Sequence, residues 1–126
     1  MIKTVVSIDL PVDEKLLIKK NTISSAGNTE EADGLKRISI VTGIHGDELE
    51  GQFVCFEIQR RIKEHPECLT GIVDIYPALN PLGIDSVTRS LPAFDIDMNK
   101  TFPGFNDGTM IEHLAANIMQ DLRGSD

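Results

Sequence analysis

An apolar run followed by a glycine-rich turn constrains the fold of this chain more than any other feature. Residues 38–41, Ile-Ser-Ile-Val, are typical of a buried strand, and the turn Gly43-Ile44-His45-Gly46-Asp47-Glu48 follows them at once. Residues 49–62 are typical of a helix and residues 71–77 of another strand. A strand, a helix and a strand in this order predict a parallel crossover, which is right-handed in nearly all proteins. The pattern therefore predicts an α/β fold.

Both predicted long helices carry recognisable start signals. In the first, Asp47 can cap the helix and Glu50 can complete a capping box. In the second, residues 109–122, Thr109 and Glu112 can fill the same two roles, and apolar residues recur with the helical period. The first helix is rich in apolar residues, so we expect neighbouring elements to cover it well: Leu49, Phe53, Val54, Phe56, Ile58 and Ile62.

The remaining segments are less regular. Residues 3–10 predict a strand, and residues 15–20 are either a second strand or a short irregular piece. Residues 21–34 are polar and rich in Ser, Asn, Glu and Gly, which predicts a loop. Residues 80–106 contain many turn residues and show no clear period. Loops of that length are usually functional or disordered, so this segment is a candidate for site residues.

Charge and composition exclude several classes of function. A chain of 126 residues suits a single domain, which we place at residues 1–126. The net charge of -8 and the pI of about 4.8 argue against binding to nucleic acid or to an anionic membrane. No apolar run approaches transmembrane length, and no signal-peptide pattern is visible. Cys55 and Cys68 match no zinc motif and are interpreted as reduced thiols, so we expect a cytoplasmic protein.

His45 and Glu48 are the strongest candidates for a metal site. They stand three residues apart at the start of the first helix, so both side chains can reach one point. Imidazole and carboxylate are common ligands of divalent metals, zinc above all. A single His-x-x-Glu also arises often by chance. Its position at the carboxyl end of a strand favours a ligand site, because open α/β sheets bind ligands there.

The long segment 80–106 adds further polar candidates. Arg89 and Lys100 can hold a carboxylate or a developing oxyanion. The alternative for each is a solvated surface charge. Asp97 and Asn99 can likewise be turn residues that bond to their own backbone.

Several other residues are interpreted as structural. We expect His113 to lie on the exposed face of its helix and His65 in an exposed helix-ending turn. We expect Tyr76, near the end of a strand, to be half-buried. Met98 and Met110 are interpreted as core residues.

Taken together, these motifs resemble those of the succinylglutamate desuccinylase/aspartoacylase family, which is related to the zinc carboxypeptidases. The resemblance rests on four features in a fixed order: Gly-Ile-His-Gly-Asp-Glu at 43–48, Asn-Pro-Leu-Gly at 80–83, Arg89, and Asp-Met-Asn-Lys-Thr-Phe-Pro-Gly at 97–104. It runs from about residue 38 to the C-terminus, and the first 35 or so residues add little to it.

The resemblance implies a zinc site in a mostly parallel mixed sheet flanked by helices, as in zinc carboxypeptidases. His45 and Glu48 match two of the three protein ligands of the zinc. Arg89 matches the arginine that polarises the scissile carbonyl and stabilises the tetrahedral oxyanion. The implied reaction is hydrolysis of the amide bond in a small N-acyl amino acid or a related carboxylate substrate, with zinc activating the water.

The resemblance also assigns residues to the substrate carboxylate. Asn99 and Lys100 match an Asn-Arg pair that binds this group, Asp97 matches the supporting acid of that motif, and Asn80 is a further supporting residue. Lys100 stands where the family has arginine. An ammonium is a point charge and lacks the bidentate fork of a guanidinium, so the specificity for the carboxylate is open.

The C-terminal end departs from the family pattern. In the family, a histidine that is the third zinc ligand closes the strand after the helix at 109–122, and a catalytic glutamate follows later. Here Arg123-Gly124-Ser125-Asp126 stands where that strand should begin. We therefore expect a truncated, N-terminal portion of a zinc amidohydrolase domain, in which the third zinc ligand is missing. We also expect an exposed sheet edge, through which a homo-oligomer can form.

Three functional hypotheses follow. The chain can be the metal-binding N-terminal half of a zinc amidohydrolase, active only with the rest of the domain. It can be a non-catalytic domain that keeps the scaffold and binds a partner or a carboxylate ligand. It can also be an enzyme completed by oligomerisation, in which His65 or His113 of a neighbouring copy supplies the third ligand. The sequence leaves open which acyl group is cleaved.

Overall fold

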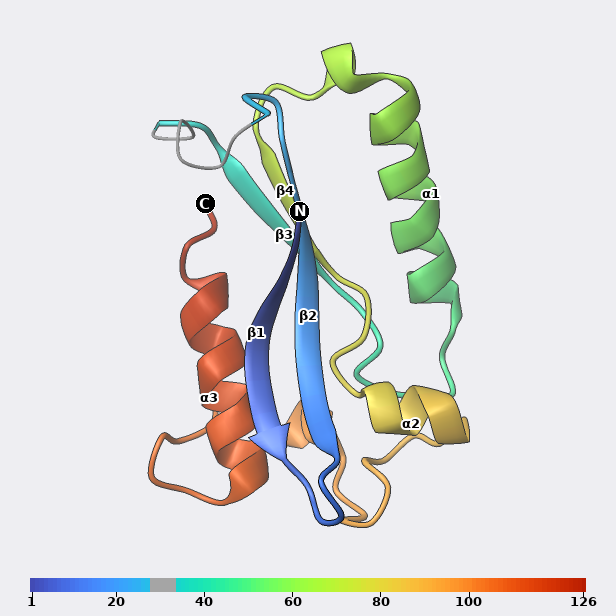
Figure 1. Ribbon diagram of the computed structural model, residues 1–126, viewed down its shortest axis with the longest axis vertical. Helices are drawn as coiled ribbons and strands as arrows, with labels where there is room; N and C mark the ends of the chain where they lie inside the picture. Colours follow the sequence, from blue (N-terminus) through green and yellow to red (C-terminus); the bar gives the residue numbers. More distant parts are fainter. Residues whose placement is uncertain (28–33) are drawn as a thin grey trace.

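A four-stranded mixed sheet forms the centre of the protein (Figure 1). The computed structural model describes residues 1–27 and 34–126. The strands of this sheet are β1 (Ile2–Asp9), β2 (Lys15–Ser24), β3 (Arg37–Val41) and β4 (Ile72–Tyr76), in the order β1-β2-β4-β3. The helices in the described residues are α1 (Glu50–Glu64), α2 (Pro81–Ser86) and α3 (Met110–Leu122), with 3-10 turns η2 at Pro66–Cys68 and η3 at Met98–Lys100. None of the described helices has the length and apolar character needed to cross a membrane.

The pairing of the strands confirms the predicted parallel crossover but differs from the predicted proportion of parallel pairs. β3 and β4 are parallel neighbours joined through α1, as predicted. β1 pairs antiparallel with β2, and β2 pairs antiparallel with β4. The prediction of a mostly parallel sheet is therefore wrong for the described strands. Only residues 10–14 link β1 to β2, and so short a connection allows a hairpin but no crossover.

β2 is longer than predicted. The segment expected as a loop, residues 21–34, begins with four strand residues, because Asn21–Ser24 pair with Ile72–Ile75 of β4. The alternative of an irregular piece at residues 15–20 is also wrong, since this segment pairs along β1. Residues 28–33 of the expected loop lie outside the described residues.

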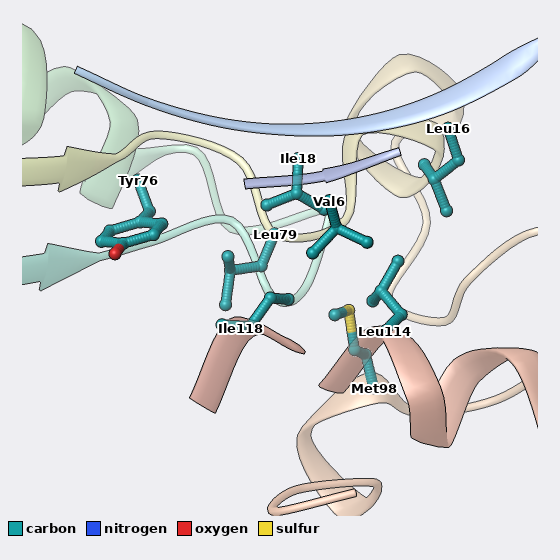
Figure 2. Close-up of a cluster of buried hydrophobic side chains, with 8 residues drawn as sticks. All are labelled: Val6, Leu16, Ile18, Tyr76, Leu79, Met98, Leu114 and Ile118. Atoms are coloured by element: carbon teal, nitrogen blue, oxygen red, sulfur yellow. The ribbon is translucent and has the colours of Figure 1, made fainter. Parts of the chain in front are cut away.

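The main hydrophobic core lies between the sheet and α3 (Figure 2). Side chains alternate between the two faces of a strand, and the even-numbered residues of β2 point toward α3. The apolar core residues come from the sheet, the loop after β4, η3 and α3: Val6, Leu16, Ile18, Tyr76, Leu79, Met98, Leu114 and Ile118. Met98 is fully buried, which confirms its interpretation as a core residue.

α1 lies on the opposite side of the sheet (Figure 1) and is less covered than predicted. Asn21, whose side chain points away from α3, donates a hydrogen bond to Gln59 of α1. Within α1 only Cys55 is buried. Phe53 and Phe56 remain 67% and 60% exposed, so the expectation of a well-covered helix is wrong in the described chain. On the covered side of α1, Cys55 is buried and Ile58 and Ile62 are half-buried, whereas Phe53, Val54 and Phe56 are exposed.

The two helix starts differ in how well the predicted caps form. α1 begins after Leu49, whose side chain makes no capping hydrogen bond, so the predicted cap by Asp47 and Glu50 is wrong. The turn that carries His45 and Glu48 occupies the residues that would have formed the first helical turn. At α3, Thr109 accepts a hydrogen bond from the Glu112 amide, and the Glu112 carboxylate accepts one from the Thr109 amide. This capping box is the one predicted.

Replacing Thr109 by alanine should lower the free energy of unfolding by about 1 kcal/mol, because one end of the capping box is lost. Chemical denaturation monitored by circular dichroism measures this change. Thr109→Ser keeps the hydroxyl and should stay close to the wild type. An equal loss in both variants would assign the effect to the threonine methyl group instead.

A cluster of buried and partly buried charges, here called the ion cluster, joins three strands to α3. Asp74 of β4 is 1% exposed and accepts hydrogen bonds from Thr22 at 2.6 Å, Arg37 at 2.6 Å and Lys20 at 3.2 Å. The Lys20 ammonium also lies 2.7 Å from the carboxylate of Asp121. Each cation therefore has a carboxylate partner, which offsets the cost of its burial.

Tyr76 lies beside the ion cluster and is fully buried, so the prediction that it is half-buried is wrong. α3 covers the end of β4, and the Tyr76 hydroxyl donates a hydrogen bond to Asp121. Burial, together with the hydrogen bond to Asp121 and its charge, raises the pKa of the Tyr76 phenol well above its usual range.

The segment 80–106 contains more regular structure than predicted. Its first residues form the short helix α2, and Met98–Lys100 form η3. The start of α2 was visible in the sequence, because Asn80 caps the helix and Pro81 occupies its first turn. Its short length left no helical period to detect.

Candidate functional site

Close backbone packing fixes the turn that carries His45. The turn follows β3 and precedes α1, which places it at the carboxyl end of a strand, as predicted. Gly43 has a φ of +67°, and a Cβ there would lie 3.0 Å from the backbone of Ala78. A Cβ on Gly46 would lie 1.9 Å from the carbonyl carbon of Gly83. Both glycines are therefore required for this approach of the turn to α2.

His45 stands between two carboxylates. Its Nε2 lies 3.0 Å from Oδ1 of Asp97, and its Nδ1 lies 3.3 Å from Oε1 of Glu48. The His45 side chain is 11% exposed and that of Asp97 is 18% exposed, whereas that of Glu48 is 61% exposed. The expected convergence of His45 and Glu48 on one point is therefore present. Glu48 lies in the turn before α1 and not in the first helical turn, where we predicted it.

Asp97 is held as an anion by its neighbours. The hydrogen bond with His45 lowers the pKa of the Asp97 carboxyl below its ordinary value, and the Asn99 amide and the charges of His45 and Arg89 act in the same direction. Oδ1 of Asp97 accepts the Asn99 N–H at 3.1 Å. Asp97 thus bonds to the backbone of its own turn and also contacts the imidazole. Its interpretation as a turn residue is therefore compatible with a place in the candidate site.

The separation of His45 Nδ1 and Glu48 Oε1 fits that of two ligand atoms of one zinc ion. Zinc binds imidazole and carboxylate at about 2.1 Å, so two ligand atoms in a tetrahedron lie about 3.4 Å apart. The 3.3 Å between Nδ1 of His45 and Oε1 of Glu48 is close to this separation. A carboxylate on the other imidazole nitrogen, as Asp97 provides, is the usual outer partner of a zinc-binding histidine. Across residues 1–27 and 34–126, no three His, Cys, Asp or Glu side chains form a group able to hold a metal.

Arg89 reaches the same point from the segment after α2. Its guanidinium lies 3.4 Å from the Glu48 carboxylate and 3.7 Å from that of Asp97. The side chain is 55% exposed, so these pairs contribute little to stability. Its placement nevertheless puts a hydrogen-bond donor beside the two carboxylates, where a developing negative charge would need one.

A pocket of about 430 Å³ opens beside His45. It is lined by the end of β3, the His45 turn, the start of α1 and Asn99: Val41, Thr42, Gly43, Ile44, His45, Glu48, Glu50, Gly51 and Asn99. Glu50, which we predicted as a capping residue, is a pocket residue instead. The sequence feature that could have indicated this role is the group of acidic residues at 47, 48 and 50, which suits a cation.

The other predicted site residues are only partly gathered here. Asn99 lines the pocket, whereas Lys100 is exposed on η3 and is not among the lining residues. Asn80 is fully buried at the start of α2. His65 and His113 are both exposed, as predicted, and neither lines this pocket.

Solved structures of similar fold include proteins of the aspartoacylase and succinylglutamate desuccinylase families. An aspartoacylase family protein from Mesorhizobium loti superposes with a TM-score of 0.68 at 26% identity, covering 98% of this chain and 37% of that protein. A succinylglutamate desuccinylase/aspartoacylase from Rhodobacter sphaeroides gives 0.65 at 31% identity, with coverage of 82% and 29%. The product-bound ectoine utilization protein of Ruegeria pomeroyi gives 0.66 at 25% identity, with coverage of 90% and 32%.

These matches describe a shared fold over part of longer proteins. The chain spans 29–37% of the length of the three relatives. No curated protein sequence matches it at a significant level. The sequence profile of the succinylglutamate desuccinylase/aspartoacylase catalytic domain matches residues 34–125, a range that includes the His45 turn, α2, Arg89, η3 and α3. The chain therefore belongs to the succinylglutamate desuccinylase/aspartoacylase family.

Proposed function

We propose that the chain carries the metal-binding part of the active site of a zinc-dependent hydrolase, which cleaves the amide bond of a small N-acyl amino acid. The observation that carries the proposal is the geometry of His45. One nitrogen is held by Asp97, and the other lies beside Glu48 at the separation expected of two zinc ligands. The membership of a family of deacylating enzymes supports the same reaction class.

In this proposal His45 and Glu48 hold the zinc, and Asp97 orients the imidazole. Bound zinc would supply an activated water and a polarised substrate carbonyl. With Nε2–H donated to Asp97, the lone pair of Nδ1 is directed toward the side on which Glu48 lies. Arg89 donates hydrogen bonds to the oxyanion that forms when water adds to the carbonyl.

The substrate carboxylate would meet Asn99 and Lys100 of η3. Asn99 already lines the pocket beside His45. Lys100 would have to turn toward the pocket, and its ammonium would attract the carboxylate as a point charge. We therefore propose a substrate with a free carboxylate but with looser recognition of that group than an arginine would give.

A non-catalytic binding domain is the second candidate function. The observation that favours it is the lack of a three-ligand group among the described residues. A domain of this kind would bind an N-acyl amino acid at the pocket and release it unchanged.

The two candidates differ in what zinc does to the substrate. The test incubates the chain, alone and together with the remaining part of a family catalytic domain, with N-succinyl and N-acetyl amino acids, first with zinc and then with excess chelator, and measures release of the free amino acid. The hydrolase predicts amide cleavage that the chelator abolishes and that zinc restores. Saturable binding of the intact substrate without cleavage, measured by calorimetry, would support the binding domain.

A further inference from the structure

Asn80 lies at the junction between the two segments that carry His45 and Arg89. It is fully buried, and its main-chain N–H donates to the Gly43 carbonyl at 2.7 Å. Its side-chain Oδ1 accepts the Gly83 N–H at 2.8 Å, and its Nδ2 donates to the Ser90 carbonyl at 3.2 Å. One residue therefore contacts the His45 turn, α2 and the segment of Arg89.

The side-chain amide of Asn80 can make these contacts in one orientation only. The Gly83 N–H needs an acceptor, and the Ser90 carbonyl needs a donor. Rotating the amide by half a turn would place a donor against a donor and an acceptor against an acceptor. The Ser90 carbonyl also accepts from the Thr88 hydroxyl at 3.1 Å, so the groups left unpaired by the rotation would be the buried Asn80 amide and the Gly83 N–H, at the desolvation cost of those groups.

A second pair of hydrogen bonds ties the same segments together. The Thr88 N–H donates to the Gly83 carbonyl at 2.9 Å, and the Thr88 carbonyl accepts the Gly46 N–H at 2.9 Å. Thr88 and Ser90 are thus both anchored, and Arg89 lies between them. The exposed Arg89 side chain starts from a fixed backbone, although its own ion pairs are long.

We infer that Asn80 is a positioning residue, which holds the Arg89 segment in register with the His45 turn through its bond to Ser90. The inference rests on the proposed function, because the register matters for catalysis only if Arg89 stabilises the oxyanion. The donor Nδ2 is the atom that carries the coupling. The acceptor Oδ1 carries a different task, the capping of α2.

Two substitutions separate these tasks. Asn80→Asp keeps an acceptor for the Gly83 N–H but faces the Ser90 carbonyl with an oxygen in place of the donor. Asn80→Ser keeps a capping hydroxyl that is too short to reach Ser90, and it serves if the buried carboxylate prevents folding. Asn106→Asp is the matched control, because it makes the same change in charge at an exposed residue outside the site.

The first measurement is amide hydrogen exchange, which does not depend on activity. In Asn80→Asp and Asn80→Ser, exchange over residues 87–90 should rise about 10-fold or more, whereas α3 should exchange as in the wild type. The Asn106→Asp control should leave both segments unchanged. Unchanged exchange over residues 87–90 in a folded Asn80 variant would overturn the inference, whether or not the chain proves to be an enzyme.

The second measurement tests whether Asn80 acts through Arg89. If the chain hydrolyses an N-acyl amino acid, kcat should fall about 100-fold in Asn80→Asp with little change in KM, since a small misplacement of an oxyanion donor has an effect of this size. The double variant with Arg89→Ala should be no slower than Arg89→Ala alone. Multiplicative losses in the double variant would overturn the positioning role. A wild type that cleaves nothing even with the rest of a family catalytic domain present would count against the proposed function, and the exchange measurement would still decide the coupling.

Discussion

Replacing His45 by alanine should weaken zinc binding by at least about 100-fold, because loss of an outer-shell partner alone weakens metal affinity by about 10–100-fold and His45 is proposed to be a direct ligand. Glu48 would then be the one proposed ligand left, and because its side chain is 61% exposed, water would compete with it for the metal. Zinc content after equilibrium dialysis, measured by mass spectrometry, reports the change. The wild type should retain zinc under conditions in which the variant retains none.

The other two histidines provide matched controls. His65→Ala and His113→Ala remove the same ring from exposed residues outside the pocket, so both should retain zinc as the wild type does. A loss of zinc in either control would assign that histidine as a ligand donated by a neighbouring copy. Equal zinc content in the wild type and His45→Ala would contradict the proposed metal site.

Replacing Asp74 by alanine should lower the free energy of unfolding by about 3–5 kcal/mol, because removal of one partner from a buried ion pair leaves its cation uncompensated. Asp74 is 1% exposed and bonds to Lys20, Arg37 and Thr22. After the change, Arg37 has no carboxylate partner within the ion cluster, and Lys20 keeps only Asp121. Urea denaturation of the purified variant measures the loss.

Asp9→Ala is the control for this prediction. Asp9 pairs with Lys15 on the surface, where its side chain is 84% exposed, so its loss should cost less than about 1 kcal/mol. Similar losses in the two variants would show that the burial of Asp74 does not give it special weight.

The same residue predicts how stability depends on pH. Burial opposes ionisation of Asp74, but the hydrogen bonds from Thr22 and Arg37 and the charge of Lys20 outweigh it and lower the pKa of the carboxyl below its ordinary value of 3.8. The unfolded chain therefore binds a proton more readily than the folded one in this range. The stabilisation is present above the ordinary pKa and is lost as the pH falls through the lower pKa of the folded state. The acid-induced loss of stability should accordingly be smaller in Asp74→Ala.

Local sequence signals predicted the elements whose interactions are themselves local. α3 and its capping box follow from Thr109, Glu112 and the helical period. The meeting of His45 and Glu48 follows from their spacing in a tight turn. These features need no knowledge of distant residues. The roles of the two side chains in binding zinc remain predictions.

Features that depend on contacts between distant segments were not predictable in the same way. Lys20 and Asp74 look like ordinary polar strand residues, and only the pairing of β2 with β4 brings them together under α3. The exposure of Phe53 and Phe56 depends on which side of α1 the rest of the protein covers. The hydrogen bond from Nδ2 of Asn80 to the Ser90 carbonyl likewise depends on the path that the chain takes after α2.

The contact between the His45 turn and α2 has a consequence for protein engineering. Any side chain at Gly46 or Gly83 would enter space already filled by protein atoms. A combinatorial library that tests the proposed carboxylate site should therefore leave both glycines fixed and randomise exposed residues such as Asn99 and Lys100. Substitutions at the two glycines would disrupt the packing of the turn against α2, whereas substitutions at the exposed residues of η3 would leave that packing intact.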